Sequence, residues 1–134
     1  MSDFNDQIIA DFRANGGYVG APFHSNDLVL LQTIGAKSGV ARVIPLLSFP
    51  DDEGWVIVAS KGGAPENPGW YYNLIAHPDV EIEFGTETIP VRASVIGEAE
   101  RAERWVGITT SNPGFAEYEK TAGRVIPLVR LARR

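Results

Sequence analysis

Two short stretches of this sequence combine cations, hydroxyls and glycines, a mixture that suits an anionic ligand. The first is Gly35-Ala36-Lys37-Ser38-Gly39-Val40-Ala41-Arg42. Glycines let the backbone turn tightly and expose its N–H groups, while Lys37 adds a point charge, Ser38 a hydroxyl donor and Arg42 a planar fork suited to phosphate or carboxylate. The spacing is not that of a P-loop, so the stretch predicts either an anion-binding turn or an ordinary basic hairpin turn.

The second stretch, Ala59-Ser60-Lys61-Gly62-Gly63, follows an apolar run and again sets a lysine and a hydroxyl beside accessible backbone. Two such loops at the ends of neighbouring strands favour one shared anion site. Further on, Asn67-Pro68-Gly69-Trp70-Tyr71-Tyr72-Asn73 places three adjacent aromatic residues on one short helix. They cannot all face a core, so we expect at least one to line a groove or an interface, although packing is the commoner fate of any single ring.

Other catalytic arrangements are poorly supported. The chain has no cysteine, and its two histidines, His24 and His77, have no second histidine or carboxylate at a metal-ligand spacing. We therefore expect no metal site, and we expect His77 to be a cap or a surface residue. No Ser-His-Asp arrangement is apparent, and the acidic run 51–53 is typical of a solvated turn. These absences favour chemistry supplied by a bound cofactor, with the protein positioning it.

The charge distribution limits the partners. The net charge of −5 over 134 residues argues against nucleic acid, whose phosphates select basic surfaces. No apolar run approaches the ~20 residues of a membrane span, and the N-terminus lacks a signal pattern. We therefore expect a cytoplasmic protein. Residues 1–91 contain few cations, and most of these lie near glycine-bracketed turns, an arrangement that suits a small anionic ligand or represents ordinary surface charge: Arg13, Lys37, Arg42 and Lys61.

Hydrophobic periodicity predicts the elements that must position these residues. A helix over 3–15 has an acidic polar face, which gives little support to membrane contact. We expect one domain over 1–134, with an N-terminal helix in 1–17 and an antiparallel six-stranded β-barrel over 27–132, hence an α+β fold that is mainly β with about four peripheral helices. The predicted strands are 28–34, 43–49, 55–60, 80–84, 88–96 and 125–132, and the later helices are 67–75, with Asn67 as the cap, 98–110 and 113–121.

The motifs together resemble the deazaflavin-dependent nitroreductase family. The resemblance covers about 28–131 and rests on Leu31 to Arg42, Pro45-Leu46, Val58 to Gly63, Asn67 to Leu74, Ala76-His77-Pro78 and Arg124-Val125-Ile126-Pro127. It implies a split β-barrel related to flavin-mononucleotide-binding proteins. It also implies coenzyme F-420, an 8-hydroxy-5-deazaflavin with a phosphate and a glutamate tail, whose reduced form donates hydride to quinones or nitroaromatics.

The resemblance also implies residue roles. Lys37, Ser38 and Arg42 would hold the phosphate and the tail. Ser60 would lie near the deazaflavin ring and donate a hydrogen bond to the acceptor, and Tyr118 matches a family tyrosine of the acceptor pocket. The remaining cofactor-binding residues would be Pro45, Leu46, Ala59, Lys61, Gly62, Gly63, Trp70 and Asn73.

The chain departs from the family pattern in the C-terminal helical region. Asn112 and Phe115 stand where the best-known pattern has tyrosines that contribute to the acceptor pocket. We therefore expect quinone reduction to be retained and bulky nitroimidazole reduction to be weak. The alternatives are a flavin-mononucleotide-dependent oxidoreductase of the same fold, a non-catalytic deazaflavin-binding protein, and a structural barrel with incidental basic turns. Barrels of this type often pair, so a homodimer is compatible with the resemblance.

Overall fold

The computed structural model describes residues 3–17 and 28–134, which form six strands, four α-helices and one 3-10 helix. In chain order these elements are α1 (Asp3–Ala14), β1 (Leu28–Ile34), β2 (Ala41–Asp51), β3 (Gly54–Val58), the 3-10 helix η1 (Lys61–Gly63), α2 (Gly69–Ala76), β4 (Asp79–Phe84), β5 (Glu87–Val95), α3 (Glu98–Ser111), α4 (Gly114–Ala122) and β6 (Leu128–Arg133).

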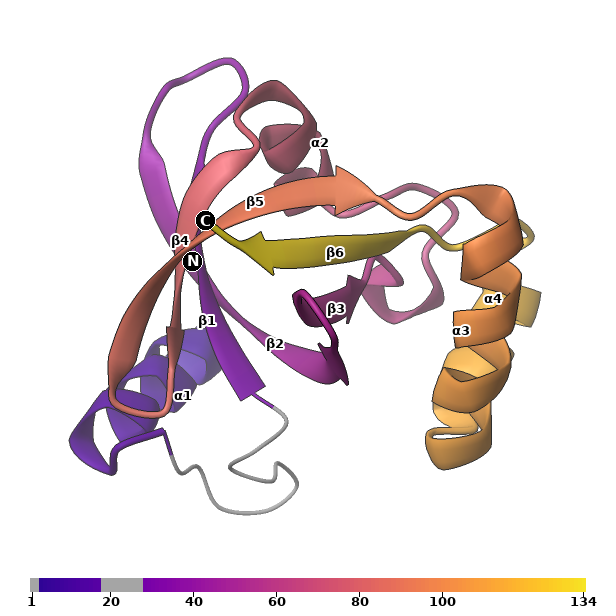
Figure 1. The fold of residues 1–134 in the computed structure, drawn as a ribbon, viewed down its shortest axis with the longest axis horizontal. Helices are drawn as coiled ribbons and strands as arrows, with labels where there is room; N and C mark the ends of the chain where they lie inside the picture. Colours follow the sequence, from indigo (N-terminus) through magenta and orange to yellow (C-terminus); the bar gives the residue numbers. More distant parts are fainter. Residues whose placement is uncertain (1–2, 18–27) are drawn as a thin grey trace.

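The strands close into a barrel in the order β1-β2-β3-β6-β5-β4, and every neighbouring pair is antiparallel (Figure 1). β2 is long enough to pair with two different strands along its length. Its residues 41–47 pair with β1, and its residues 48–51 pair with β3. Among the described residues, the first part of β2 therefore has a strand on one side only. The expected six-stranded antiparallel barrel is confirmed.

The alternation of side chains along β1 explains how the sheet is covered on both faces. Val29 and Leu31 point into the barrel and belong to its main hydrophobic cluster, together with Ile57, Ile82 and Leu131 among others. Leu28 and Leu30 point outward and pack against Ile8 and Phe12 of α1. Because both faces are buried, β1 is a nearly continuous apolar run.

The helices cover different parts of the barrel. α1 lies against β1 and β2, whereas α3 and α4 lie side by side at the opposite side of the molecule (Figure 1). Ile108 of α3 and the half-buried Trp105 and Phe115 pack against Val56 and Val58, the outward-facing residues of β3. Within the described residues, no helix is both long and apolar enough to cross a membrane.

Several boundaries differ from those predicted by the sequence. β2 is longer than expected at both ends, β3 stops two residues early, and β6 starts at Leu128, after Pro127, whose carbonyl accepts a hydrogen bond from Ala59. The cap of α2 was also predicted wrongly: Pro68 occupies that position and makes no side-chain cap. His77 is the C-cap of α2, as expected. His24 and residue 27, where we expected the barrel to begin, lie outside the described residues.

Candidate functional site

An open cleft of about 1080 Å³ lies at the end of the barrel where the chain turns from β1 into β2, next to α2. This volume lies at the upper end of the range for small-molecule and cofactor sites. The cleft is bordered by α1, the turn after β1, the first half of β2, the segment after β3 and the start of α2. Its lining residues are Asn5, Thr33, Gly35, Ala36, Lys37, Ser38, Arg42, Val43, Ile44, Leu46, Val58, Ser60, Lys61, Pro68, Gly69, Trp70, Tyr72 and Asn73.

The floor of the cleft changes from apolar to polar along β1 and β2. The register pairs Val29 with Leu46, Leu31 with Ile44 and Thr33 with Arg42, so that these three pairs share one face of the sheet. The first two pairs are apolar and pack against the barrel core, whereas the third is a hydroxyl beside a guanidinium. A ligand along this row would meet an apolar surface at one end and a cation at the other.

The turn between β1 and β2 is held in place by its own hydrogen bonds and by α2. Gly35 N–H donates a hydrogen bond to the carbonyl oxygen of Val40 at 2.9 Å, and Ser38 Oγ accepts the N–H of Val40 at 3.2 Å. A Cβ on Gly35 would lie 2.3 Å from Ser38 Oγ, so any larger residue there would require the Ser38 side chain to move. Asn73 Oδ1 accepts the N–H of Ala36 at 2.9 Å, which ties the turn to α2.

Lys37 and Arg42 differ from every other cation in the chain. Neither has a hydrogen-bond, ion-pair or aromatic partner among the described residues, and both line the cleft. The other ten cations all have such partners: Arg13, Lys61, Arg92, Arg101, Arg104, Lys120, Arg124, Arg130, Arg133 and Arg134. Two free cations at one end of a cleft form a site for an anionic group.

The segment after β3 is shaped by Arg124, which lies between α4 and β6. Its guanidinium donates to the carbonyl oxygens of Ala59 at 3.2 Å, Ala64 at 3.2 Å and Glu66 at 2.9 Å, and to the amide oxygen of Asn67. These bonds fold residues 59–67 around one side chain and place Ser60 and Lys61 at the cleft. The side chain of Asn67 binds Arg124, which explains why it does not cap α2.

Lys61 has a strained backbone and an exposed ion pair. Its φ of 48° lies in the left-handed region, which is uncommon for a residue with a Cβ. Its ammonium contacts Glu66 at 2.9 Å, and this hydrogen bond lowers the pKa of the Glu66 carboxyl. Because both side chains are largely exposed, Lys61 can exchange Glu66 for a ligand at little cost.

The structure brings eight of the sequence-predicted site residues together in the cleft lining, namely Lys37, Ser38, Arg42, Leu46, Ser60, Lys61, Trp70 and Asn73. Pro45 is not among the lining residues, although its neighbours Ile44 and Leu46 are. Ala59 is fully buried and belongs to the core. Gly62 and Gly63 lie in η1, and Gly63 does not line the cleft.

Tyr118 lies on α4 next to η1 and is not a lining residue of the cleft. A Cβ on Gly63 would come within 3.4 Å of the Tyr118 ring. Phe115 packs between Tyr118 and Phe49, with ring centroids 5.9 and 6.0 Å away. Asn112 is the C-cap of α3. In this arrangement the aromatic side chains of α4 pack on each other and on the outside of β2.

The sequence analysis missed several lining residues. Asn5 reaches the cleft from α1, a contact between distant parts of the chain that no local pattern indicates. Thr33, Ile44 and Val43 lie on the two strands that flank the predicted turn, and for Thr33 a signal was present. Thr33 is the next inward-facing position of β1 after Val29 and Leu31. A polar residue at this position indicates where the apolar interior of the barrel ends and the cleft begins.

The described residues contain no group of histidine and carboxylate side chains that could hold a metal ion. The cleft instead offers an apolar floor, an indole, four hydroxyl side chains and two free cations. This combination suits an elongated aromatic molecule with an anionic end. The class is thus a six-stranded antiparallel β-barrel with an open cleft at one end.

The chain belongs to the F420H(2)-dependent quinone reductase family, whose sequence profile matches residues 7–132. An F420H(2)-dependent quinone reductase of Mycobacterium tuberculosis (strain H37Rv) is 39% identical over 109 residues, covering 79% of this chain and 73% of the relative. A second, putative F420H(2)-dependent quinone reductase of the same strain is 38% identical over 106 residues, covering 79% and 89%.

Solved structures agree with this assignment. An F420-H2 dependent reductase is 36% identical with a TM-score of 0.70, covering 78% of this chain and 93% of that chain. A structure described as a domain-swapped dimer is 31% identical with a TM-score of 0.73, covering 94% of both chains. The fold is therefore that of the F420H(2)-dependent reductases, as the resemblance in the sequence implied.

Proposed function

We propose that this chain is an F420H(2)-dependent reductase that binds coenzyme F-420 in the cleft and reduces a quinone. The observation that carries the proposal is the pair of free cations, Lys37 and Arg42, at the polar end of an apolar cleft in a chain of this family. The family's cofactor has the matching parts, an aromatic ring system at one end and a phosphate with a carboxylate tail at the other.

The residues present fit this cofactor in a defined direction. Arg42 and Lys37 bind the phosphate. Ser38, on the same turn, accepts the N–H of Val40 with its oxygen, so its hydroxyl hydrogen stays available for donation to the phosphate. Leu46 and Ile44 form the apolar floor under the ring, with Trp70 of α2 beside it. Asn73 fixes the anion-binding turn through Ala36 N–H.

When bound, the reduced coenzyme supplies a hydride. The protein's contribution is to hold the acceptor over the ring, exclude water and stabilise charge on the acceptor. Ser60 lies at the cleft with its hydroxyl unpaired among the described residues, and it donates a hydrogen bond to a carbonyl oxygen of the acceptor. Such positioning contributes several kcal/mol to lowering the barrier.

The preferred acceptor in this proposal is a quinone. Phe115 packs between Phe49 and Tyr118, and as a phenylalanine it has no hydroxyl to offer an acceptor. Asn112 is the C-cap of α3. Tyr118 is about two-fifths exposed beside η1, where it can contact a bound acceptor at the rim. With one tyrosine left in this region, we expect a planar quinone to be reduced faster than a bulky nitroimidazole.

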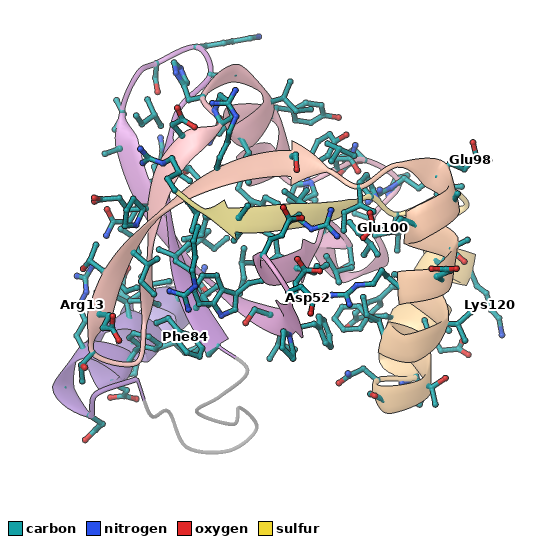
Figure 2. The ribbon with its side chains drawn as sticks, in the orientation of Figure 1. Arg13, Asp52, Phe84, Glu98, Glu100 and Lys120 are labelled. Atoms are coloured by element: carbon teal, nitrogen blue, oxygen red, sulfur yellow. The ribbon has the colours of Figure 1, made fainter. Side chains whose placement is uncertain are left out.

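A fluorescence titration with oxidised F-420 tests the cofactor, with flavin mononucleotide as the comparison ligand. We expect saturable binding of F-420 that is weakened in Lys37→Ala and Arg42→Ala. Lys120→Ala is the matched control, because Lys120 extends into solvent from α4, away from the cleft (Figure 2). Tighter binding of flavin mononucleotide would favour the flavin-dependent alternative, and no binding of either ligand would refute the proposal.

The acceptor is tested by following the reoxidation of reduced F-420 with menadione and with a bicyclic nitroimidazole in the absence of oxygen. Faster turnover of menadione is expected. Binding of F-420 without turnover of any quinone would favour the non-catalytic carrier. A homodimer, which the domain-swapped relative supports, is tested in the same preparations by light scattering after gel filtration.

A further inference from the structure

Thr33 is a buried polar residue that no role proposed so far explains. Its side chain is 3% exposed and lines the cleft. It has no hydrogen bond to any described residue, whereas buried polar groups in folded proteins are almost always hydrogen-bonded. Among the described residues, Arg104 Nε is the one fully buried side-chain nitrogen or oxygen that lacks a hydrogen-bond partner. The hydroxyl of Thr33 is therefore not fully buried, and it has a small exposure at the cleft.

The position of Thr33 is fixed by the strand register. It lies directly opposite Arg42 on the same face of the β1–β2 pair, where Cβ atoms of opposed residues are about 5 Å apart. The next pair along this face is Leu31 and Ile44, which pack on the barrel core. The Thr33–Arg42 pair therefore lies at the end of the apolar floor, with Lys37 farther on in the turn, and the hydroxyl of Thr33 carries no charge of its own.

We propose that the hydroxyl of Thr33 binds the hydroxylated chain that joins the deazaflavin ring to the phosphate. The inference rests on the proposed function, which places the ring over Leu46 and Ile44 and the phosphate at Arg42 and Lys37. A ligand that spans both must pass Thr33 with the part that links them. A threonine hydroxyl can both donate to and accept from an alcohol, so it matches a neutral polyol.

This assignment makes Thr33 a specificity residue for the linker. A ligand with an apolar linker would leave the hydroxyl buried and unpaired, which costs more than the hydrogen bond contributes. Ser60, another unpaired hydroxyl of the cleft, follows β3 and is not part of this row. The two hydroxyls therefore serve different parts of the bound molecules.

The test compares Thr33→Val, which replaces the hydroxyl by a methyl group of similar shape, with Thr33→Ser, which keeps the hydroxyl. Thr88→Val is the control, because Thr88 is an exposed strand threonine that does not line the cleft. Dissociation constants are measured by fluorescence for oxidised F-420 and for its fragment that keeps the ring and the hydroxylated chain and lacks the phosphate. Thermal unfolding without ligand is measured for each variant.

We expect Thr33→Val to weaken both ligands by the same factor, about three- to tenfold, which is the usual range for one neutral hydrogen bond. Thr33→Ser should restore most of the affinity, and Thr88→Val should leave it unchanged. Arg42→Ala should weaken F-420 and leave the fragment's affinity unchanged, because the fragment lacks the group that Arg42 binds. Equal affinity of wild type and Thr33→Val for both ligands would overturn the inference.

Two further outcomes separate this inference from the proposed function. If Thr33→Val weakens F-420 but not the fragment, the hydroxyl contacts the phosphate end and the linker assignment is wrong. If wild type binds neither ligand, the proposed function fails before Thr33 is tested. A change in unfolding temperature without a change in either dissociation constant would make Thr33 a structural residue only, which also overturns the inference.

Discussion

The charged residues at the two ends of β2 differ in whether they have ion-pair partners. Near its beginning, Arg42 lines the cleft and has no partner among the described residues, and neither does Lys37 in the preceding turn. At its end, Asp51 is buried and contacts Arg130 at 2.9 Å and Arg104 at 3.2 Å. A cation that an intramolecular carboxylate already satisfies contributes to the fold, whereas a cation left free beside a cleft is available to a ligand.

The ion-pair end joins three segments that are distant in the sequence. Arg130 of β6 binds Asp51 of β2 and Glu100 of α3, and Glu53 lies 3.3 Å from the same guanidinium. Figure 2 shows Glu100 on the side of α3 that faces the sheet. Hydrogen bonding with Glu100 and Asp51 raises the pKa of Arg130, and hydrogen bonding with Arg130 lowers the pKa of Asp51. The group therefore stabilises the contact between the barrel and α3.

The largest effect expected is on stability, from Arg130→Met. This change leaves the buried Asp51 without its closest cation, and we expect the free energy of unfolding to fall by about 2–3 kcal/mol. F-420 affinity should stay the same, since Arg130 does not line the cleft. Urea unfolding and a fluorescence titration measure the two quantities. A loss of affinity at unchanged stability would contradict the division between the two ends of β2.

The reverse pattern is expected from Arg42→Gln. Removing a charge-assisted contact to the phosphate should weaken F-420 binding by roughly thirtyfold, or about 2 kcal/mol, and leave the unfolding free energy of the ligand-free protein within about 0.5 kcal/mol of wild type. The rise in unfolding temperature that saturating F-420 produces in wild type should be smaller in the variant. An Arg42→Gln protein that is destabilised without ligand would show that Arg42 has a structural partner.

A smaller and mixed effect is expected from Arg124→Lys, because this residue connects the fold to the cleft. Lysine keeps the charge but loses the planar fork that reaches several acceptors of residues 59–67 at once. We expect a loss of about 1 kcal/mol in stability and a two- to threefold loss of F-420 affinity, through the displacement of Ser60 and Lys61. The same two assays apply, and an effect on stability alone would show that the segment keeps its position without Arg124.

The pH dependence of stability provides the finest test of the ion-pair end. The folded-state pKa of Asp51 lies below its unfolded value, so its contribution is fully present above that unfolded value, near pH 4, and is lost as pH falls through the folded value. Asp51→Asn should therefore flatten the loss of stability below about pH 4. Asp52→Asn, in the adjacent exposed turn (Figure 2), should leave the profile unchanged. Glu83, whose pKa is lowered by hydrogen bonding to Arg13, would keep some slope in every variant.

The sequence allowed the barrel and eight of the cleft residues to be predicted, because both depend on local patterns. Alternating and continuous apolar runs indicated all six strands, and the glycine-bracketed turn indicated Lys37, Ser38 and Arg42. Long-range contacts could not be predicted. The partner of Asn67 is Arg124, which is 57 residues away, and Asn5 reaches the cleft from a helix before the barrel.

Several of the predicted site residues do not line the cleft, and their roles stay predictions. Pro45 and Leu46 are adjacent in β2 and point to opposite faces, but alternation alone does not decide which residues line the cleft, because the consecutive residues Arg42, Val43 and Ile44 all line it. The same alternation would have placed Thr33 inside. By contrast, the burial of Ala59 depends on the packing of β3 against other strands, and only the structure shows it.

The single-sided pairing of residues 41–47 has a consequence for how this protein behaves at high concentration. A strand with a free side can pair with a strand of another molecule, which is a common start of aggregation, and charged residues and prolines reduce this tendency. Arg42 is a charge on this strand, and Pro45 in its middle has no N–H to offer a new neighbour. Both residues lower the tendency of this part of the barrel to pair with another molecule through β2, which gives Pro45 a role although it does not line the cleft.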